Sequence, residues 1–230
     1  MDFPDIVAID GPAASGKSTI GHILAERWGY LYFDTGVMYR AITWVALERG
    51  IPVEEESRVT YLAETVDIDV QSPSVEDGRD YDVLADGVDV TWAIRRPEVD
   101  QNVSVVAAYP GVRKALTAQQ RRIGMRGEVI MVGRDIGTVV LPEADLKIFL
   151  IASVQERARR RYQQRLERGE DVEFQPILKG MKKRDEIDST REVAPLQAAE
   201  DAILIDSDQM TIEEVVQEIE SIAREIGKEG

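Results

Sequence analysis

Short runs of apolar residues alternate along the chain with longer segments whose apolar positions recur at helical spacing. Three of the short runs, at 5–10, 129–132 and 147–152, have the composition of buried strands. Two more short strands are expected at 30–34 and 203–206. Because short buried strands separated by amphipathic helices indicate a largely parallel sheet covered by helices, the pattern predicts an α/β fold.

The segments between these runs predict the helices. Ile20, Leu24 and Trp28 would share one helical face just after the first strand. Thr211 and Glu214 have the spacing of a capping box, which predicts the start of a last helix. Other helices are expected at 38–48, 97–126 and 153–168.

Residues 66–92 have a different character. The stretches VDIDV, YDVLADG and VDVTW alternate apolar and polar residues, with Pro, Asp and Gly between them. This is the signature of antiparallel hairpins. We therefore predict a core domain from 1–65 and 110–230, interrupted by a hairpin-bearing insert at 66–109.

The charge balance limits the partners that the protein can have. The 28 basic and 43 acidic side chains give a net charge of −15, which repels nucleic acid and anionic membranes. With no cysteine and one histidine, thiolate and histidine-rich metal sites are excluded. No apolar run approaches the roughly 20 residues of a membrane span, so we expect a cytoplasmic protein. No long unpaired apolar stripe is evident, so we also expect a monomer.

A phosphate-binding loop is the clearest chemical motif. The sequence GPAASGKS matches G-x-x-x-x-G-K-S/T, between the first strand and the first helix. Small residues let backbone N–H groups surround a phosphate chain, Lys17 reaches the β and γ phosphates, and Ser18 can hold Mg²⁺. The alternative is a glycine turn without a ligand. The residues expected to bind ATP are Gly11, Pro12, Ala13, Ala14, Ser15, Gly16, Lys17, Ser18 and Thr19.

The remaining motifs favour a phosphotransferase over a switch or a motor. The only asparagine, Asn102, is followed by Val103, so the guanine motif N-K-x-D of GTPases is absent. A basic surface for nucleic acid is not expected either. A phosphotransferase needs a second anion site and a cationic lid, and the stretches 156–169 and 179–191 are rich in Arg and Lys. The alternative is a pair of solvated helices.

Two further arginines lie at the expected ligand edge of the sheet. Arg40 follows the 30–34 strand and Arg134 follows the 129–132 strand, where each could bind an acceptor phosphate. Asp135 could read an amino-bearing base, although an ordinary ion pair at a turn is an equal alternative. Asp10 either orients a Mg²⁺-bound water or caps the loop, and His22 is expected to be structural.

Several stretches resemble the bacterial cytidylate kinases, a family of P-loop nucleoside monophosphate kinases. They are DTGVMYRA (34–41), IRRPEV (94–99), VAAYPGVRKAL (106–116), GRDIGTVVLPEADLKIFLIAS (133–153), ERARRR (156–161) and RDEIDSTREVAPL (184–196). They cover nearly the whole chain in the family's order. The resemblance implies a P-loop NTPase-type sheet, a small antiparallel insert and a helical lid at about 156–170.

The resemblance also implies the roles of individual residues. The monophosphate would be held through its phosphate or sugar by Thr35, Arg40, Arg134 and Asp188. Cytosine would be contacted by Ser104, Arg113 and Asp135. Arg184 and Arg191 would approach the transferring phosphate and the acceptor, with Arg160 on the ATP side, so the catalytic set would be Lys17, Arg134, Arg184 and Arg191.

The expected reaction is in-line transfer of a phosphoryl group from ATP, with Mg²⁺, to CMP and dCMP. Positioning and charge neutralisation would suffice without a general base. The sequence departs from the family pattern in two places. Thr35 stands where serine is also common, and the stretch RDEIDSTR has fewer arginines than in some relatives, with Ile187 and Thr190 in the neighbouring positions. The alternatives are another small-acceptor kinase, of the UMP or shikimate type, and a regulatory module that binds ATP without transferring phosphate.

Overall fold

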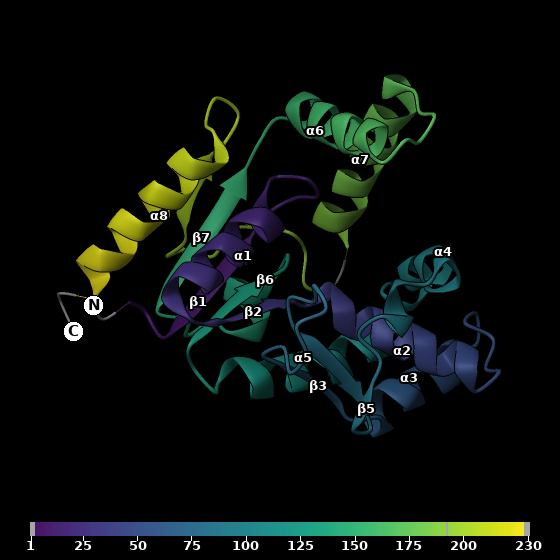
Figure 1. Cartoon of the computed structure of the whole chain (residues 1–230). Helices are drawn as coiled ribbons and strands as arrows, with labels where there is room; N and C mark the ends of the chain where they lie inside the picture. Colours follow the sequence, from purple (N-terminus) through teal and green to yellow (C-terminus); the bar gives the residue numbers. More distant parts are fainter. Residues whose placement is uncertain (1–2, 192, 228–230) are drawn as a thin grey trace.

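A parallel sheet forms the centre of the molecule. The structure, a computed structural model, describes residues 3–191 and 193–227, and within them the sheet has the strand order β2-β6-β1-β7-β8 (Figure 1). Every pairing is parallel. The strands are β1 (Ile6–Asp10), β2 (Leu31–Asp34), β6 (Val129–Val132), β7 (Leu146–Ile151) and β8 (Ile203–Asp206). The predicted α/β fold and its strands are confirmed.

The strand register brings the candidate residues to one edge. Ile9 of β1 lies opposite Val132 of β6, and Asp34 of β2 lies opposite the same residue. Since the strands are parallel, their carboxyl ends meet there, and so do the loops that follow them. Asp10, Asp34 and Gly133 therefore share the edge at which the sequence places them.

The first and last helices lie side by side along the sheet. α1 (Lys17–Trp28) packs against β6 and against α8 (Ile212–Ile226), with Ile20 and Leu24 buried. The predicted capping box of α8 is confirmed. Thr211 Oγ1 accepts a hydrogen bond from the Glu214 backbone N–H. The Glu214 carboxylate in turn accepts one from the Thr211 backbone N–H.

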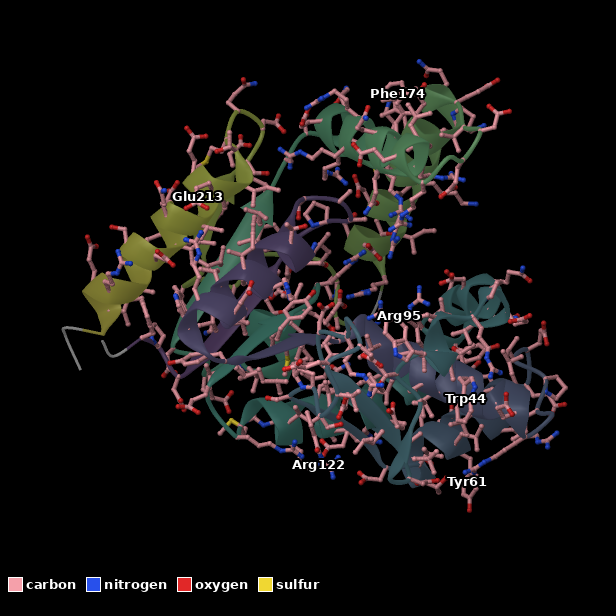
Figure 2. All side chains as sticks on the ribbon, viewed as in Figure 1. Trp44, Tyr61, Arg95, Arg122, Phe174 and Glu213 are labelled. Atoms are coloured by element: carbon pink, nitrogen blue, oxygen red, sulfur yellow. The ribbon has the colours of Figure 1, made fainter. Side chains whose placement is uncertain are left out.

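A second part of the molecule contains a small antiparallel sheet. Its strands β3 (Ile68–Gln71), β4 (Asp82–Ala85) and β5 (Val88–Asp89) confirm the predicted hairpins. α2 (Gly36–Glu48) packs against α3 (Glu56–Thr65), a helix that the sequence pattern did not predict. Trp44 of α2 and Tyr61 of α3 lie in this part, away from Glu213 on α8 (Figure 2).

The helical stretch predicted at 97–126 consists of two helices. They are α4 (Pro97–Val106) and α5 (Pro110–Gly124). Pro110 lacks a backbone N–H and forces Tyr109 into an extended conformation, with φ −72° and ψ 120°. α4 packs against α2 and α5 packs against α3. The division into 1–65, 66–109 and 110–230 stays a prediction.

The basic stretches form a helical pair beyond the sheet. α6 (Val154–Glu167) follows β7 and packs against α7 (Phe174–Thr190), and both stand apart from the hairpin-bearing part (Figure 1). The N-cap of α6 is Ser153, whose hydroxyl accepts from the Glu156 N–H. No helix among residues 3–191 and 193–227 is long and apolar enough to cross a membrane.

Candidate active site

The loop between β1 and α1 has the shape of an anion cradle. Gly11 has φ +147°, and a Cβ there would lie 2.1 Å from the Leu150 carbonyl oxygen, so only glycine fits. Gly16 is also left-handed, with φ +100°. The first turn of α1 has no acidic residue and no side-chain cap, which leaves its N–H groups open to an anion.

Lys17 is buried inside this loop. Its Nζ donates to the Pro12 carbonyl oxygen at 2.6 Å and to Ser15 Oγ at 3.3 Å. Burial, and after it the charge of Arg134, lower the pKa of Lys17 to about 7. A polyphosphate at the loop would supply the negative charge that the buried ammonium lacks.

A hydroxyl and a carboxylate face each other beside the loop. Ser18 Oγ donates to Asp34 Oδ2 at 3.3 Å, and Asp34 Oδ1 accepts from the Gly36 N–H at 3.0 Å. Such hard oxygen donors suit Mg²⁺, which usually takes few protein ligands and keeps waters and substrate phosphates. Among the described residues no group of three or more His, Cys, Asp or Glu is placed to hold a metal. The remaining ligands would have to be phosphate oxygens and water.

Thr19, the last residue of the predicted loop, is exposed on α1.

Asp10 ties the loop edge to the chain that follows β6. Its two carboxylate oxygens accept from the backbone N–H groups of Ile136 at 2.9 Å and Gly137 at 2.8 Å. These residues begin the short π-helical turn η2 (Ile136–Val140). Burial raises the pKa of Asp10 to about 6. Both oxygens are thus bound by the turn that follows β6 and not by the phosphate loop, and whether Asp10 also orients a Mg²⁺-bound water stays a prediction.

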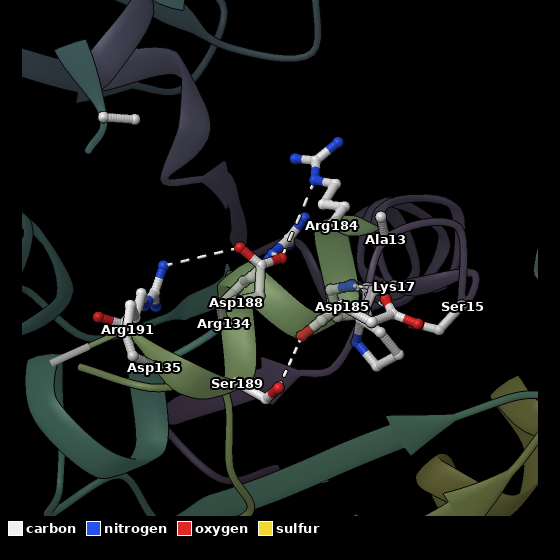
Figure 3. A network of polar contacts seen from close by, with 12 residues as sticks. Ala13, Ser15, Lys17, Arg134, Asp135, Arg184, Asp185, Asp188, Ser189 and Arg191 are labelled. Atoms are coloured by element: carbon white, nitrogen blue, oxygen red, sulfur yellow. Dashed lines mark hydrogen bonds and ion pairs between the residues drawn. The ribbon is translucent and has the colours of Figure 1, made fainter. Parts of the chain in front are cut away.

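Asp188 of α7 gathers three of the predicted arginines (Figure 3). Arg134 Nε lies 2.5 Å from Asp188 Oδ2, while Arg184 Nε lies 3.9 Å from the same oxygen. Arg191 NH1 lies 3.9 Å from Asp188 Oδ1. One carboxylate thus organises a strongly cationic cluster.

A second carboxylate extends this cluster toward the interior. Asp135 Oδ2 accepts from Arg113 NH2 at 2.9 Å, and both side chains are buried. Arg191 NH2 lies 3.7 Å from Asp135 Oδ1, so Arg191 links the two carboxylates. The Arg113 guanidinium stacks 5.6 Å from the Tyr39 ring centroid, and its buried Nε has no hydrogen-bond partner. An unpaired buried donor beside a carboxylate is suited to bind the polar edge of a ligand.

Other predicted residues lie outside this cluster. Arg40 of α2 is paired with Asp100 of α4, and Thr35 Oγ1 donates to the Val132 carbonyl oxygen at 3.2 Å. Ser104 is exposed on α4 and has no hydrogen bond to Arg113 or Asp135. The structure therefore brings together Arg113, Arg134, Asp135, Arg184, Asp188 and Arg191, and it leaves Arg40 and Ser104 apart from them.

Arg157 has a role that the sequence did not indicate. Its guanidinium binds both carboxylate oxygens of Asp185 at 3.0 and 2.6 Å and donates to the carbonyl oxygens of Ala13 and Ala152. It therefore joins α6, α7 and the phosphate loop. In the run ERARRR nothing distinguishes Arg157 from Arg159, and only its burial identifies it.

Arg160, which is expected on the ATP side, is held by Ser207. Its NH1 and NH2 donate to the Ser207 hydroxyl at 3.0 Å and to the Ser207 carbonyl at 2.6 Å. The Ser207 hydroxyl lies 3.3 Å from the carbonyl oxygen of Ser15. The link therefore ends on the phosphate loop, and no sequence signal pointed to Ser207.

Comparison with known proteins gives full-length relatives. The chain is 49% identical over 219 residues to the cytidylate kinase of Herpetosiphon aurantiacus, covering 95% of this chain and 94% of that protein. It is 51% identical over 216 residues to the cytidylate kinase of Chloroflexus aggregans, covering 94% and 92%. A solved structure of an uncharacterized protein from Eubacterium ventriosum shares the fold, with a TM-score of 0.52 over 96% of this chain and 98% of that one, at 11% identity.

The parallel sheet, the phosphate loop and the arginine cluster define a P-loop phosphotransferase. The family model of cytidylate kinase matches residues 7–225. With that match and these relatives, the chain belongs to the cytidylate kinase family. It is a nucleoside monophosphate kinase that transfers a phosphoryl group from ATP to CMP and dCMP. The predicted activity is thus confirmed, and neither another small-acceptor kinase nor a non-catalytic ATP-binding module is favoured.

Proposed function

We propose that ATP and the acceptor nucleotide meet at the cluster organised by Asp188 and Asp135. Gly11 to Thr19 and Arg160 would hold ATP, and Lys17 would contact its β and γ phosphates. The observation that carries this proposal is the position of Arg134, Arg184 and Arg191 around the single carboxylate of Asp188. These cations would neutralise the charge that spreads over the phosphoryl oxygens during transfer.

The acceptor would lie on the opposite side of the cluster. Its phosphate and sugar would be bound by Thr35, Arg40, Arg134 and Asp188, and Arg184 and Arg191 would approach the transferring group. The phosphate oxygen of the acceptor is already nucleophilic at neutral pH, so the residues act by positioning and by charge. Closure of the α6–α7 pair, the proposed lid, would exclude water that competes as acceptor.

Magnesium fits the Ser18 and Asp34 oxygens beside the loop. The ion supplies charge neutralisation to the phosphates when it is bound. Ser18 would be its ligand, and Asp34 would orient the Ser18 hydroxyl through the 3.3 Å contact.

We further propose that the protein is a cytoplasmic monomer. It would act on free nucleotides, because its net charge of −15 disfavours nucleic acid and anionic membranes as partners.

We assign the reading of cytosine to Asp135, Arg113 and Ser104. The cytosine amine would donate to Asp135, whose Oδ1 lies 3.7 Å from Arg191 NH2, while the ring acceptors would meet Arg113 and Ser104. Uracil presents a carbonyl where cytosine presents the amine. A buried mismatch of this kind costs roughly 1–3 kcal/mol, which favours CMP and dCMP over UMP.

Asp135→Asn tests this assignment. Because an amide can donate to the uracil carbonyl, we expect kcat/KM for CMP to fall by about 5- to 150-fold, the equivalent of roughly 1–3 kcal/mol, and the CMP to UMP ratio to fall with it. The measurement is steady-state kinetics with ATP, Mg²⁺ and CMP, dCMP or UMP.

Glu143→Gln is the matched control. Glu143 is paired with Arg121, and its side chain is 39% exposed, so removing its charge should leave the ratio unchanged. A variant Asp135→Asn that kept the wild-type CMP to UMP ratio would show that Asp135 does not read the base.

A further inference from the structure

Arg40 is occupied by a carboxylate of its own chain. Its NH2 lies 2.5 Å from Asp100 Oδ1, and its NH1 donates to the Ile94 carbonyl oxygen at 3.1 Å. Ile94 lies in the 3-10 turn η1 (Ala93–Arg95), and Asp100 lies in the first turn of α4. The guanidinium that we propose for the acceptor phosphate is thus already bound by an anion.

Carboxylate and phosphate compete for the same geometry. The planar fork of arginine presents its N–H groups to either group in the same way, so an anion already bound there blocks the other. We propose that Asp100 is an internal competitor of the acceptor: its carboxylate occupies the phosphate site on Arg40 until the monophosphate displaces it. This inference rests on the proposed role of Arg40 in binding that phosphate.

The contact is weak enough to be displaced. The Asp100 side chain is 54% exposed and the Arg40 side chain is 32% exposed, so water screens the pair. A monophosphate brings up to two negative charges, against one on Asp100. An ion pair this exposed changes an equilibrium constant by less than about five-fold. Asp100 would therefore lower the affinity for the acceptor monophosphate without preventing its binding.

Release of Asp100 would also bear on the base. Ser104 lies four residues after Asp100 in α4, so the two side chains are on the same face, one turn apart. The acceptor phosphate and the cytosine contact proposed for Ser104 would therefore meet the same face of α4. Phosphate binding and base reading would be linked through a single helix.

Asp100→Asn tests the competition. We expect KM and Kd for CMP to fall by about two- to five-fold, with kcat and the KM for ATP unchanged. Steady-state kinetics and calorimetric titration of CMP give these values, and Asp100→Ala should reproduce them. If both variants leave CMP affinity unchanged or weaken it, the competition is refuted.

Glu48→Gln separates a specific effect from a general one. Glu48 is paired with Arg96, next to the start of α4, and both side chains are about as exposed as Asp100. The variant removes one negative charge nearby without touching Arg40. Its CMP affinity should equal that of the wild type, and a gain as large as that of Asp100→Asn would overturn the proposal.

The Arg40→Ala background distinguishes failure of the inference from failure of the proposed function. Arg40→Ala should raise KM for CMP, and Asp100→Asn should then add nothing. If Arg40→Ala leaves KM for CMP unchanged, the proposed role of Arg40 fails. If it raises KM while Asp100→Asn lowers KM equally in both backgrounds, only the competition through Arg40 fails.

Discussion

At the scale of single residues, the site concentrates positive charge in a molecule whose net charge is −15. Lys17 shows the cost of this arrangement, because burial among cations makes its ammonium easier to deprotonate. Arg191 is lowered in pKa by burial and by Arg113, and it keeps its charge because arginine starts far above neutral pH. The arginines thus give permanent charge, whereas Lys17 depends on its ligand.

Binding of ATP should therefore be coupled to protonation of Lys17. The pKa of Lys17 is about 7 without ligand, and the added phosphates raise it, so the complex takes up a proton above pH 7 and affinity falls as pH rises through that value. Below pH 7 the lysine is already protonated and the uptake vanishes. Calorimetric titration at pH 8 in buffers of different ionisation enthalpy measures the uptake.

Lys17→Arg is the control for this titration. Its guanidinium stays charged across the whole range, so proton uptake at pH 8 should disappear even if ATP still binds. Equal uptake by the wild type and by this variant would locate the proton on another group.

At the scale of elements, Arg157 fixes how α6 and α7, the proposed lid, join the phosphate loop. It lies in α6, contacts Asp185 of α7, and donates to Ala13 in the loop between β1 and α1. Its side chain is only 5% exposed. A buried guanidinium with these partners places α7, and with it Asp188, relative to the loop that binds ATP.

Removing this junction should destabilise the protein and slow transfer. Arg157→Ala leaves Asp185 and the Ala13 carbonyl without their donor, which costs roughly 2–4 kcal/mol of the free energy of unfolding. Chemical denaturation measures the loss in the free energy of unfolding. Steady-state kinetics should show a lower kcat, because α7 would no longer be held in place over the phosphate loop.

Arg159→Ala is the matched control, two residues further along the same helix. The Arg159 side chain is 70% exposed and forms an ion pair with Glu156 of the same helix, so the variant should keep the wild-type stability and kcat. Equal losses in both variants would mean that the junction has no special part in holding the lid.

At the scale of the whole molecule, the two proposed nucleotide sides are carried by different parts. The α6–α7 pair and the part with α2 to α4 extend from the same end of the sheet (Figure 1). Phosphoryl transfer requires the two substrates in contact and water excluded. We expect the two parts to approach each other when both nucleotides are bound.

Fluorescence energy transfer can follow this approach, because the chain has no cysteine and introduced labels are unambiguous. Leu166 of α6 and Tyr61 of α3 are exposed by 41% and 64% and suit labelling after Leu166→Cys and Tyr61→Cys. CMP together with a non-hydrolysable ATP analogue should raise the transfer efficiency between these labels.

A control pair stays within one part. Labels introduced by Tyr61→Cys and Met125→Cys, at the end of α5 against which α3 packs, should show no change on addition of the nucleotides. If the lid pair also stays unchanged with both nucleotides bound, closure of the lid is excluded.

Local sequence was informative wherever neighbours in the chain decide the structure. The turn Gly11–Gly16, the capping box of Thr211 and Glu214, and the hairpins all depend on residues close together in sequence. The helical spacing over 97–126 does not mark the break between α4 and α5, which Pro110 sets through the extended conformation of Tyr109. α3 was missed because its short, polar stretch leaves only Val59, Leu62 and Ala63 buried.

The sequence by itself determined the strand–loop–helix unit, the alternation of strands and helices, and the identity of the arginines available to a phosphate. Only the tertiary structure decided which partner each arginine takes. Arg134 and Asp188 are 54 positions apart, and Arg40 pairs with Asp100 from another helix. Ion pairs of this kind depend on how distant elements pack, and a charge in sequence carries no record of its neighbours in space.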